Sequence, residues 1–406
     1  MGCLLLATVV AVSTASARTS KKSATGLTVS LFIDAQTANW RPIVEAANTQ
    51  FEADHPGVKV FVKFRTWGDP LGDSGFPEES RPDVVEVANT QMTKYMAAGA
   101  LAELDPADYE NSRHWLTALA LPGRYNGKTY GVPYYAASPR VVTYRDDLFK
   151  KAGVKVPNSL AKFQAGAVKL NQKFGKKGFS PVYIAGTDWY SAMSFVFDYG
   201  GGIAQWKNGK WHALLATPQS IRGLKAFKSF WLAASRAKKT SNEATPPPYD
   251  VYAQGRAAAI VGPAWFSSSV GAKYASKTKQ FVMPSHKAGR PMPGFLGGSD
   301  LAIPATSKMK SAAVDWIKIY TGTVSENKLK AIGLIPNATN LLDRSKICGN
   351  CPAASQSWFV PVTANWATVE NSNVLRTMLW QILTNRLTVL KAAQNADDNI
   401  EFTLNS

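Results

Sequence analysis

The chain has little cysteine and little histidine for its 406 residues. Its three cysteines exclude a disulfide-dense mini-fold, because such folds need several bridges in a short chain. The four histidines stand far apart, and no zinc-protease, nucleophile-elbow, phosphate-loop or dinucleotide-binding motif is present. The sequence therefore carries no signature of metal-dependent or nucleophilic catalysis. A catalytic triad, or a pair of carboxylates, that comes together only in the fold stays open.

Long apolar runs are also scarce. One run, residues 4–12, lies near the start, and no later stretch is long and apolar enough to span a membrane. Residues 15–17 (Ala-Ser-Ala) match the small-x-small pattern of a signal-peptidase site. We therefore predict a signal peptide over residues 1–17, although no positive charge precedes the run; a buried N-terminal helix is the alternative. Cys3 precedes the run, whereas a lipoprotein cysteine follows one, so we expect a released protein.

Removal of this leader leaves two cysteines, Cys348 and Cys351, in the sequence Cys-Gly-Asn-Cys. In a secreted protein such a pair forms a small disulfide loop, which we predict here. A thioredoxin-like redox pair needs a helix that begins at the first cysteine, whereas Pro352 follows the second one. A zinc site needs two further ligands, and no cysteine or histidine nearby supplies them. We expect neither a metal nor a cofactor.

Acidic residues are few, since 28 Asp and Glu stand against 46 Lys and Arg, which gives a formal charge of +18. The basic residues are dispersed in small groups, such as the lysine pairs at 150–151, 176–177 and 238–239. No basic helix or aromatic–basic repeat appears, so we expect no nucleic-acid ligand. A solvated basic surface accounts for this charge, and attraction to an anionic envelope polymer or an acidic ligand is the alternative.

What the sequence does contain is an alternation of strand and helix patterns. Apolar residues alternate over 27–33, recur every four residues over 43–51 and alternate again over 58–64, with no hairpin turn between. This order favours a βαβ unit, a parallel sheet and an α/β fold of two lobes. No composition break separates the lobes, so we expect the chain to cross between them more than once. Further helices are predicted over 160–174, 220–235, 312–320 and 374–396, strands over 83–87, 141–144 and 257–261, and turns at 126–127 and 208–209.

Aromatic residues are plentiful, and several lie where predicted strands or helices meet loops. Flat aromatic faces stack on the apolar C–H faces of sugar rings, while polar groups bind the hydroxyls of the sugar. Core packing is the commoner role of a single aromatic residue, and we assign Trp231 and Trp316, on helix stripes, to the core. The aromatic residues at loop positions are Tyr134, Tyr135, Trp189, Tyr190, Trp265, Phe266 and Phe295.

Six segments follow one another in an order that one family shares. They are 45–64, with Phe-Glu at 51–52 and His-Pro-Gly-Val-Lys-Val at 55–60; Arg-Pro-Asp-Val-Val at 81–85; Tyr-Asn-Gly-Lys-Thr-Tyr-Gly-Val-Pro at 125–133; Val-Thr-Tyr-Arg-Asp-Asp-Leu-Phe at 142–149; 255–265, with Gly-Pro-Ala-Trp at its end; and Gly-Gly-Ser-Asp-Leu-Ala-Ile at 297–303. In these motifs, residues 27–406 resemble the extracellular solute-binding proteins of sugar ABC transporters, the maltose-binding-protein-like family.

The resemblance implies a two-lobed, periplasmic-binding-protein-like fold, with a ligand cleft between lobes that close by a hinge motion. It implies one lobe of residues 27–137 and 302–323, and another of residues 138–301 and 324–406. By motif position, it also implies ligand contacts from both lobes. These contacts are Asp34, Gln36, Asn89, Thr90, Tyr134, Tyr135, Trp189, Trp265, Phe295 and Ser299.

The function that the resemblance implies is that of a non-catalytic, monomeric receptor outside the cytoplasmic membrane. It would capture a mono- or oligosaccharide and deliver it to the permease subunits of an ABC transporter, with lobe closure as the signal. One alternative is a receptor for an anionic or non-sugar solute, which the basic charge leaves open. Another is a secreted glycan hydrolase, which would depend on paired carboxylates. A third is an envelope adhesion protein that uses the basic surface.

Overall fold

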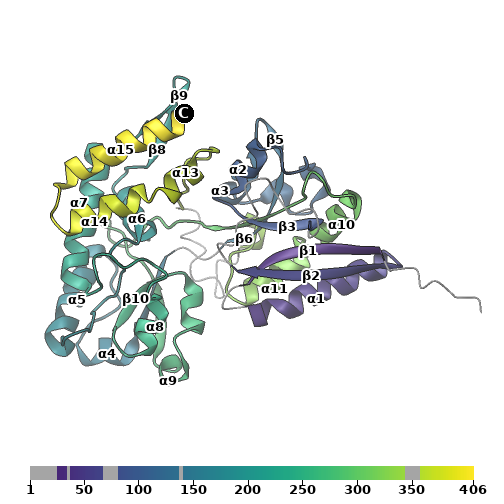
Figure 1. The fold of residues 1–406 in the computed structure, drawn as a ribbon. Coiled ribbons are helices and arrows are strands. Elements are labelled where there is room, and N and C mark those ends of the chain that lie inside the picture. Colours follow the sequence, from purple (N-terminus) through teal and green to yellow (C-terminus); the bar gives the residue numbers. More distant parts are fainter. Residues whose placement is uncertain (1–24, 34–36, 67–80, 137–139, 343–356) are drawn as a thin grey trace, which may run out of the picture.

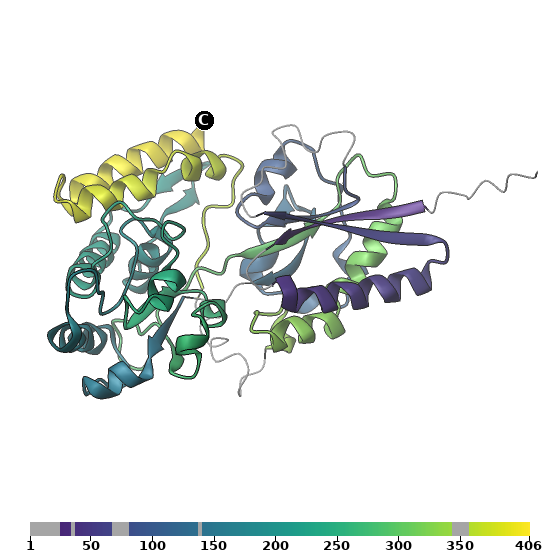
Figure 2. The same ribbon diagram turned by 60° about the horizontal axis from the view of Figure 1, so that its bottom comes forward.

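The computed structural model describes residues 25–33, 37–66, 81–136, 140–342 and 357–406. These residues form two lobes, which Figures 1 and 2 show as separate bodies joined by a few connecting segments. The first lobe is built around a five-stranded sheet, and the second contains a three-stranded sheet. The predicted two-lobed α/β fold is confirmed. No helix in the described part of the chain is long and apolar enough to span a membrane.

The sheet of the first lobe begins with the predicted βαβ unit. This unit consists of β1 (Thr25–Ile33), α1 (Thr37–Asp54) and β2 (Val58–Thr66). Strand β1 pairs in parallel with β2 on one side and with β3 (Val84–Ala88) on the other. The βαβ prediction is therefore confirmed, because the register places the two alternating segments side by side in the same direction.

Two later strands complete this sheet in the order β2-β1-β3-β12-β6. Strand β12 (Gly298–Ala302) lies antiparallel between β3 and β6 (Gly131–Ala136), so the chain returns to the first lobe after it has built most of the second. Shorter elements extend the lobe. They are α2 (Met92–Ala97), η2 (Pro106–Asp108), η3 (Ser112–His114), α3 (Thr117–Ala120), β4 (Arg124–Tyr125) and β5 (Lys128–Thr129).

Helices α10 (Lys310–Tyr320) and α11 (Thr323–Ala331) both pack against α1, on one face of this sheet. Leu329 and Leu341, the latter in η5 (Thr339–Leu341), belong to the same buried core as Trp316. This core therefore continues beyond residue 323, where the resemblance places the end of the lobe. The other expected lobe limits stay predictions.

In the second lobe, β7 (Val141–Arg145) lies between β10 (Ala259–Gly262) and β11 (Thr278–Val282), antiparallel to both. The two helices predicted here, over 160–174 and 220–235, are confirmed as α5 (Leu160–Phe174) and α7 (Pro218–Ala234). The other elements of the lobe are α4 (Asp146–Lys151), α6 (Trp189–Asp198), β8 (Ala204–Lys207), β9 (Lys210–Ala213), α8 (Pro248–Ala253), η4 (Ala264–Ser268), α9 (Ala272–Ala275), α13 (Trp366–Asn371), α14 (Val374–Leu383) and α15 (Val389–Asn405).

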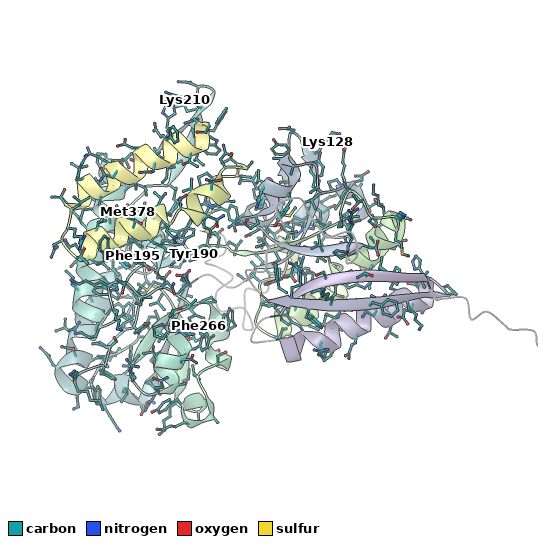
Figure 3. The ribbon with its side chains drawn as sticks, in the orientation of Figure 1. Lys128, Tyr190, Phe195, Lys210, Phe266 and Met378 are labelled. Atoms are coloured by element: carbon teal, nitrogen blue, oxygen red, sulfur yellow. The ribbon has the colours of Figure 1, made fainter. Side chains whose placement is uncertain are left out.

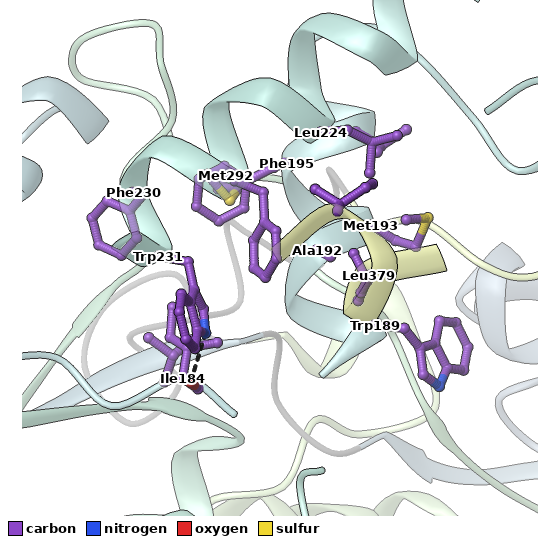
Figure 4. Packing of buried hydrophobic residues seen from close by; sticks show 14 of the residues in the cluster. Ile184, Trp189, Ala192, Met193, Phe195, Leu224, Phe230, Trp231, Met292 and Leu379 are labelled. Carbon is purple, nitrogen blue, oxygen red and sulfur yellow. Dashed lines mark hydrogen bonds between the residues drawn. The ribbon is translucent and has the colours of Figure 1, made fainter. Parts of the chain in front are cut away.

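Helices α6, α7 and α14 share the main core of the second lobe, part of which Figure 4 shows. Phe230 is fully buried there, and Trp231 donates a hydrogen bond from Nε1 to the carbonyl oxygen of Ile184 at 3.0 Å. Because this buried indole N–H has a hydrogen-bond acceptor, its burial leaves no donor unpaired. Trp231 and Trp316 are both buried, which confirms their assignment to the core.

The prediction of one C-terminal helix over residues 374–396 is wrong. Helix α14 ends at Leu383, and α15 begins at Val389 and packs back against α14. The chain reverses through Asn385, whose φ of 59° lies in the left-handed region that Asn tolerates. Thr388 then caps α15 by accepting a hydrogen bond from the backbone N–H of Lys391. Apolar spacing runs through both helices, so periodicity alone did not reveal the break.

Strand β12 carries a buried carboxyl group. Asp300 is 1% exposed, and no group in the described part of the chain is hydrogen-bonded to either of its oxygens. It lies against Gly131 of β6, where even a Cβ atom would come within 3.0 Å of the Asp300 side chain. Burial raises the pKa of Asp300 well above its ordinary value of 3.8. Ionisation of Asp300 therefore destabilises the folded protein.

Asp300→Val is expected to raise the free energy of unfolding by about 1–3 kcal/mol at neutral pH, because it removes an unpartnered buried polar group. The folded pKa lies above the unfolded one, so wild-type stability falls as pH rises from about 4 towards the folded pKa, and the variant lacks this fall. Chemical denaturation at several pH values measures both effects. Asp300→Asn, which stays polar but cannot ionise, is the control. Identical pH profiles for wild type and Asp300→Val would contradict the prediction.

Candidate functional site

An aromatic pocket lies in the second lobe and has a cavity volume of about 380 Å³. Figure 3 places two of its residues, Tyr190 and Phe266, on the side of this lobe that faces the first lobe. The volume is that of a small-molecule site, and the lining comes from segments far apart in the sequence. The lining residues are Arg140, Tyr190, Glu243, Ala244, Pro247, Tyr249, Pro263, Trp265, Phe266, Phe295 and Gly297.

One part of the wall is a cluster of three aromatic rings. Trp265 and Phe266 lie in η4, which directly follows β10, and their rings are nearly perpendicular with centroids 4.7 Å apart. Tyr249 of α8 joins them, with its ring centroid 5.6 Å from that of Trp265. Edge-to-face contacts of this kind hold aromatic rings in fixed orientations. The pocket therefore presents a preformed apolar surface.

A second part of the wall is formed by Tyr190 and Phe295, whose ring centroids lie 5.0 Å apart. Tyr190 stacks on Trp189 at 3.9 Å, and Trp189 is 2% exposed and also contacts Trp366. The stack lies at the start of α6, where Asp188 caps the helix by accepting from the backbone N–H of Ser191. Trp189 thus lies behind Tyr190 and supports it, while Tyr190 lines the pocket.

Two arginines at the pocket are each paired with a carboxylate. Arg140 donates to Asp188 at 3.1 Å, and its guanidinium lies over the Tyr190 ring, 5.2 Å from the centroid. Both terminal nitrogens of Arg376, in α14, donate hydrogen bonds to the carboxylate of Glu243. Burial alone would raise the pKa of Glu243, but hydrogen bonding to Arg376 and its charge hold this pKa below the ordinary value. Together these four side chains carry no net charge.

A third carboxylate, Glu370 of α13, accepts a hydrogen bond from the hydroxyl of Tyr190 at 3.2 Å. Burial raises the pKa of Glu370, against the effects of this hydrogen bond and of the Arg376 charge. Within the described residues, no group of three His, Cys, Asp or Glu side chains could hold a metal ion. The polar groups around the pocket therefore orient one another and its aromatic wall.

Two of the ten predicted ligand contacts, Trp265 and Phe295, line the aromatic pocket. Trp189 is adjacent to it but buried behind Tyr190. Asp34 and Gln36 lie outside the described residues, as do both cysteines of the predicted disulfide, Cys348 and Cys351.

The remaining predicted contacts lie in the first lobe, and most of them are buried. Tyr134 and Tyr135 are core residues, and the Tyr134 hydroxyl shares a 2.6 Å hydrogen bond with that of Tyr320. Asn89 donates from its side chain to the carbonyl oxygen of Leu296, close to the crossing into β12. Ser299 is buried, and Thr90 is half-buried. The role of these residues as ligand contacts stays a prediction.

Several residues of the pocket wall are not predicted by the sequence. Tyr190 and Phe266 are among the aromatic residues at loop positions, but the motif positions do not predict them as ligand contacts. The sequence around Arg140 and Glu243 contains no motif that predicts a binding role. The ion-pair partner of Glu243, Arg376, lies 133 residues away and is brought near only by the fold. Tyr249 had one available signal, since it directly follows the three prolines at 246–248 that fix the direction of the chain.

Comparison with known proteins identifies the family. The family model of the bacterial extracellular solute-binding protein matches residues 34–325. The diacetylchitobiose binding protein DasA of Streptomyces coelicolor is 31% identical over 318 residues, which cover 75% of this chain and 73% of that protein. The arabinooligosaccharide-binding protein of Bacillus subtilis is 25% identical over 272 residues, or 64% of this chain and 60% of that protein.

Solved structures share the fold at low sequence identity. The GacH receptor of Streptomyces glaucescens superimposes with a TM-score of 0.77 at 22% identity, over 94% of this chain and 98% of that one. The sugar-binding protein MalE of Xanthomonas citri gives a TM-score of 0.77 at 15% identity, over 94% and 97% of the two chains. The family match over most of the chain and the shared two-lobed fold lead to one conclusion: the chain belongs to the bacterial extracellular solute-binding proteins.

Proposed function

We propose that this chain is the extracytoplasmic receptor of an ABC importer and binds a mono- or oligosaccharide between its two lobes. The observation that carries the proposal is the aromatic pocket, in which Trp265, Tyr190 and Phe295 offer ring surfaces for stacking on a sugar. By their names, the Streptomyces coelicolor relative binds diacetylchitobiose and the Bacillus subtilis relative binds arabinooligosaccharides. Both names support a saccharide as the class of ligand.

The charge balance of the pocket favours an uncharged saccharide over an anionic one. Arg140 is compensated by Asp188, and Arg376 by Glu243. An anionic ligand would have to compete with these carboxylates for the guanidinium groups and would leave a buried carboxylate without its partner, which is costly. The overall charge of +18 therefore does not extend into the ligand site.

Glu243→Gln tests this preference, because it leaves the charge of Arg376 uncompensated. The variant is expected to bind a glucuronate-containing disaccharide more tightly than wild type does, by about 1–2 kcal/mol for a partly exposed charge. Isothermal titration with matched neutral and uronate disaccharides measures the change. Glu103→Gln, an exposed glutamate of the first lobe paired with Lys128, alters net charge equally and is the control. The same shift in both variants would contradict a local effect.

The carboxylates around the pocket support a receptor rather than a glycoside hydrolase. Hydrolysis requires two carboxyl groups that flank the scissile bond, one as acid and one as base or nucleophile. Here Asp188 and Glu243 are each held by an arginine, and Glu370 accepts from Tyr190. Hydrogen bonding to Arg376 holds the pKa of Glu243 below its ordinary value, so Glu243 is a poor general acid. We therefore propose that the chain binds its ligand without chemical change.

The receptor proposal also includes hinge closure, delivery to permease subunits and a monomeric state. Closure requires tighter ligand binding by the closed form, since only differential affinity shifts a conformational equilibrium. Residues near the crossings, such as Gly297, belong to the pocket wall, so ligand contact and lobe position are linked. Solution scattering of the purified chain is expected to show a monomer that becomes more compact with its sugar. An unchanged radius of gyration at saturation would contradict closure.

Thermal-shift screening against neutral and acidic sugars tests the proposal as a whole, with a product assay on the same panel. Stabilisation by a sugar that stays intact supports a receptor, whereas turnover would reveal a hydrolase. Stabilisation by polyamines, metal ions or peptides, with none by sugars, would overturn the saccharide assignment.

Secretion and the disulfide remain proposals of their own. We propose that residues 1–17 are removed on export and that Cys348 and Cys351 are bonded, both in the sequence outside the described residues. Intact-mass measurement of the exported protein, with and without reduction and alkylation, tests both points. A mass that retains residues 1–17, or cysteines that alkylate without reduction, would contradict the respective proposal.

A further inference from the structure

A second and larger cavity lies in the second lobe, with a volume of about 570 Å³. We call it the basic pocket, after three cationic side chains in its lining, Arg236, Lys238 and Arg256. The segment 236–247 contributes to both cavities, because Lys238 and Asn242 line the basic pocket whereas Glu243 and Pro247 line the aromatic pocket. The basic pocket is thus a separate cavity next to the proposed sugar site.

The cations of the basic pocket differ from those of the aromatic pocket in their pairing. No carboxylate is among the lining residues that the structure describes, and none of the three cations forms an ion pair with a described acidic residue. Arg236 donates from Nη1 to the carbonyl oxygens of Leu232 and Ser235, and Arg256 donates from Nη1 to Gln254. Their other nitrogens, and the Lys238 ammonium, remain available to a ligand. Three like charges without a counter-charge favour an anion.

The polar groups between these cations also favour an anion. The side-chain oxygen of Asn242 already accepts from the backbone N–H groups of Ala244 and Thr245, so its amide N–H₂ is the part left for a ligand. The Ser241 hydroxyl donates to the carbonyl oxygen of Lys238 and accepts from the N–H of Gly186. These bonds fix the segment that carries Lys238. The cavity wall therefore presents mainly hydrogen-bond donors, and the backbone that carries Lys238 is fixed by hydrogen bonds.

Tyr183 forms part of the buried floor of the cavity. It is 5% exposed and contacts the core beneath α8. Burial raises the pKa of its hydroxyl, while a hydrogen bond with Ser241 and the positive charge of Arg256 act in the opposite direction. Tyr183 therefore closes the inner side of the cavity, with its hydroxyl hydrogen-bonded to Ser241.

We propose that the basic pocket is a second binding site, for a phosphate group. Phosphate oxygens accept several hydrogen bonds at once and pair well with guanidinium groups, which matches three cations beside the Asn242 amide. The cavity has room for the group together with part of a carrier molecule. Two sources share this chemistry, namely free inorganic phosphate and a phosphodiester of an envelope polymer. The site also gives part of the basic charge a ligand.

Isothermal titration of the full chain with inorganic phosphate, at constant ionic strength in chloride, tests the site. The double variant Lys238→Gln/Arg256→Gln is expected to bind phosphate about tenfold more weakly or worse, since two of three local charges are gone. Lys239→Gln, the neighbouring lysine outside the lining, is expected to stay within about twofold of wild type. All the substituted side chains lie at the surface or partly exposed, and circular dichroism checks that each variant folds.

A parallel titration with a short glycerol-phosphate oligomer identifies the source. Tighter binding of the oligomer points to an envelope polymer, and tighter binding of inorganic phosphate points to the free ion. Either result supports the site if the double variant weakens that binding by about tenfold or more. Absence of saturable binding, or an equal loss in Lys239→Gln, would overturn the proposal. The sugar-induced thermal shift is expected to persist in the double variant, so failure of this site and failure of the proposed function give different results.

Discussion

Trp265→Ala is expected to weaken saccharide binding by about 30- to 1,000-fold, or about 2–4 kcal/mol, the range of an aromatic hot spot. Trp265 carries the largest ring system among the described residues that line the pocket, and it contacts Phe266 and Tyr249. Removal of the indole leaves a sugar ring without its stacking surface and admits water in its place. Because Trp265 is only partly buried, the cost in folding stability is expected to be small by comparison.

Isothermal titration with the sugar that gives the largest thermal shift measures this loss, and chemical denaturation measures stability. Trp206→Ala is the matched control, since Trp206 is an exposed tryptophan of the β8–β9 hairpin and does not line the pocket. The control is expected to bind the sugar as wild type does. Retained affinity in Trp265→Ala, with the fold intact, would show that the ligand does not stack on this ring.

The fold could be predicted from local sequence patterns, because these patterns do not depend on contacts with distant residues. Alternation over 27–33 and 58–64 identified the parallel pair β1 and β2, and the Asn-Gly turn at 208–209 identified the β8–β9 hairpin. Such patterns report burial on one face of an element, which the element's own residues determine. The break between α14 and α15 was missed because it depends on one left-handed residue, Asn385, within a continuous apolar stripe.

The site was harder to predict, because it depends on which face of each loop points outward. Trp265 was found because it belongs to the family-like Gly-Pro-Ala-Trp segment that follows a strand. Arg140 and Glu243 were not found, since their significance comes from partners that only the fold brings near. The neighbours Trp189 and Tyr190 show the limit most clearly. Both are aromatic and adjacent in sequence, and only the structure distinguishes the one that lines the pocket.

That distinction depends on the N-terminal turn of α6. The Asp188 cap fixes where the helix begins, and successive helical residues then point about 100° apart. Trp189 consequently enters the core, where it contacts Trp358 and Trp366, while Tyr190 faces Phe295 and Arg140 in the pocket. The two residues should therefore differ in which measured property they control.

Trp189→Ala is expected to lower the free energy of unfolding by about 3–5 kcal/mol, the cost of removing a large buried aromatic side chain. Tyr190→Ala is expected to lower it much less and to weaken sugar binding by about 1–3 kcal/mol, the usual effect of an interface aromatic. Chemical denaturation and titration of both variants measure the two quantities, with Trp189→Phe as the conservative replacement. Weaker sugar binding by Trp189→Ala with unchanged stability would show that Trp189 itself contacts the ligand, as the family resemblance implies. That result would contradict the proposal that Tyr190, and not Trp189, lines the sugar site.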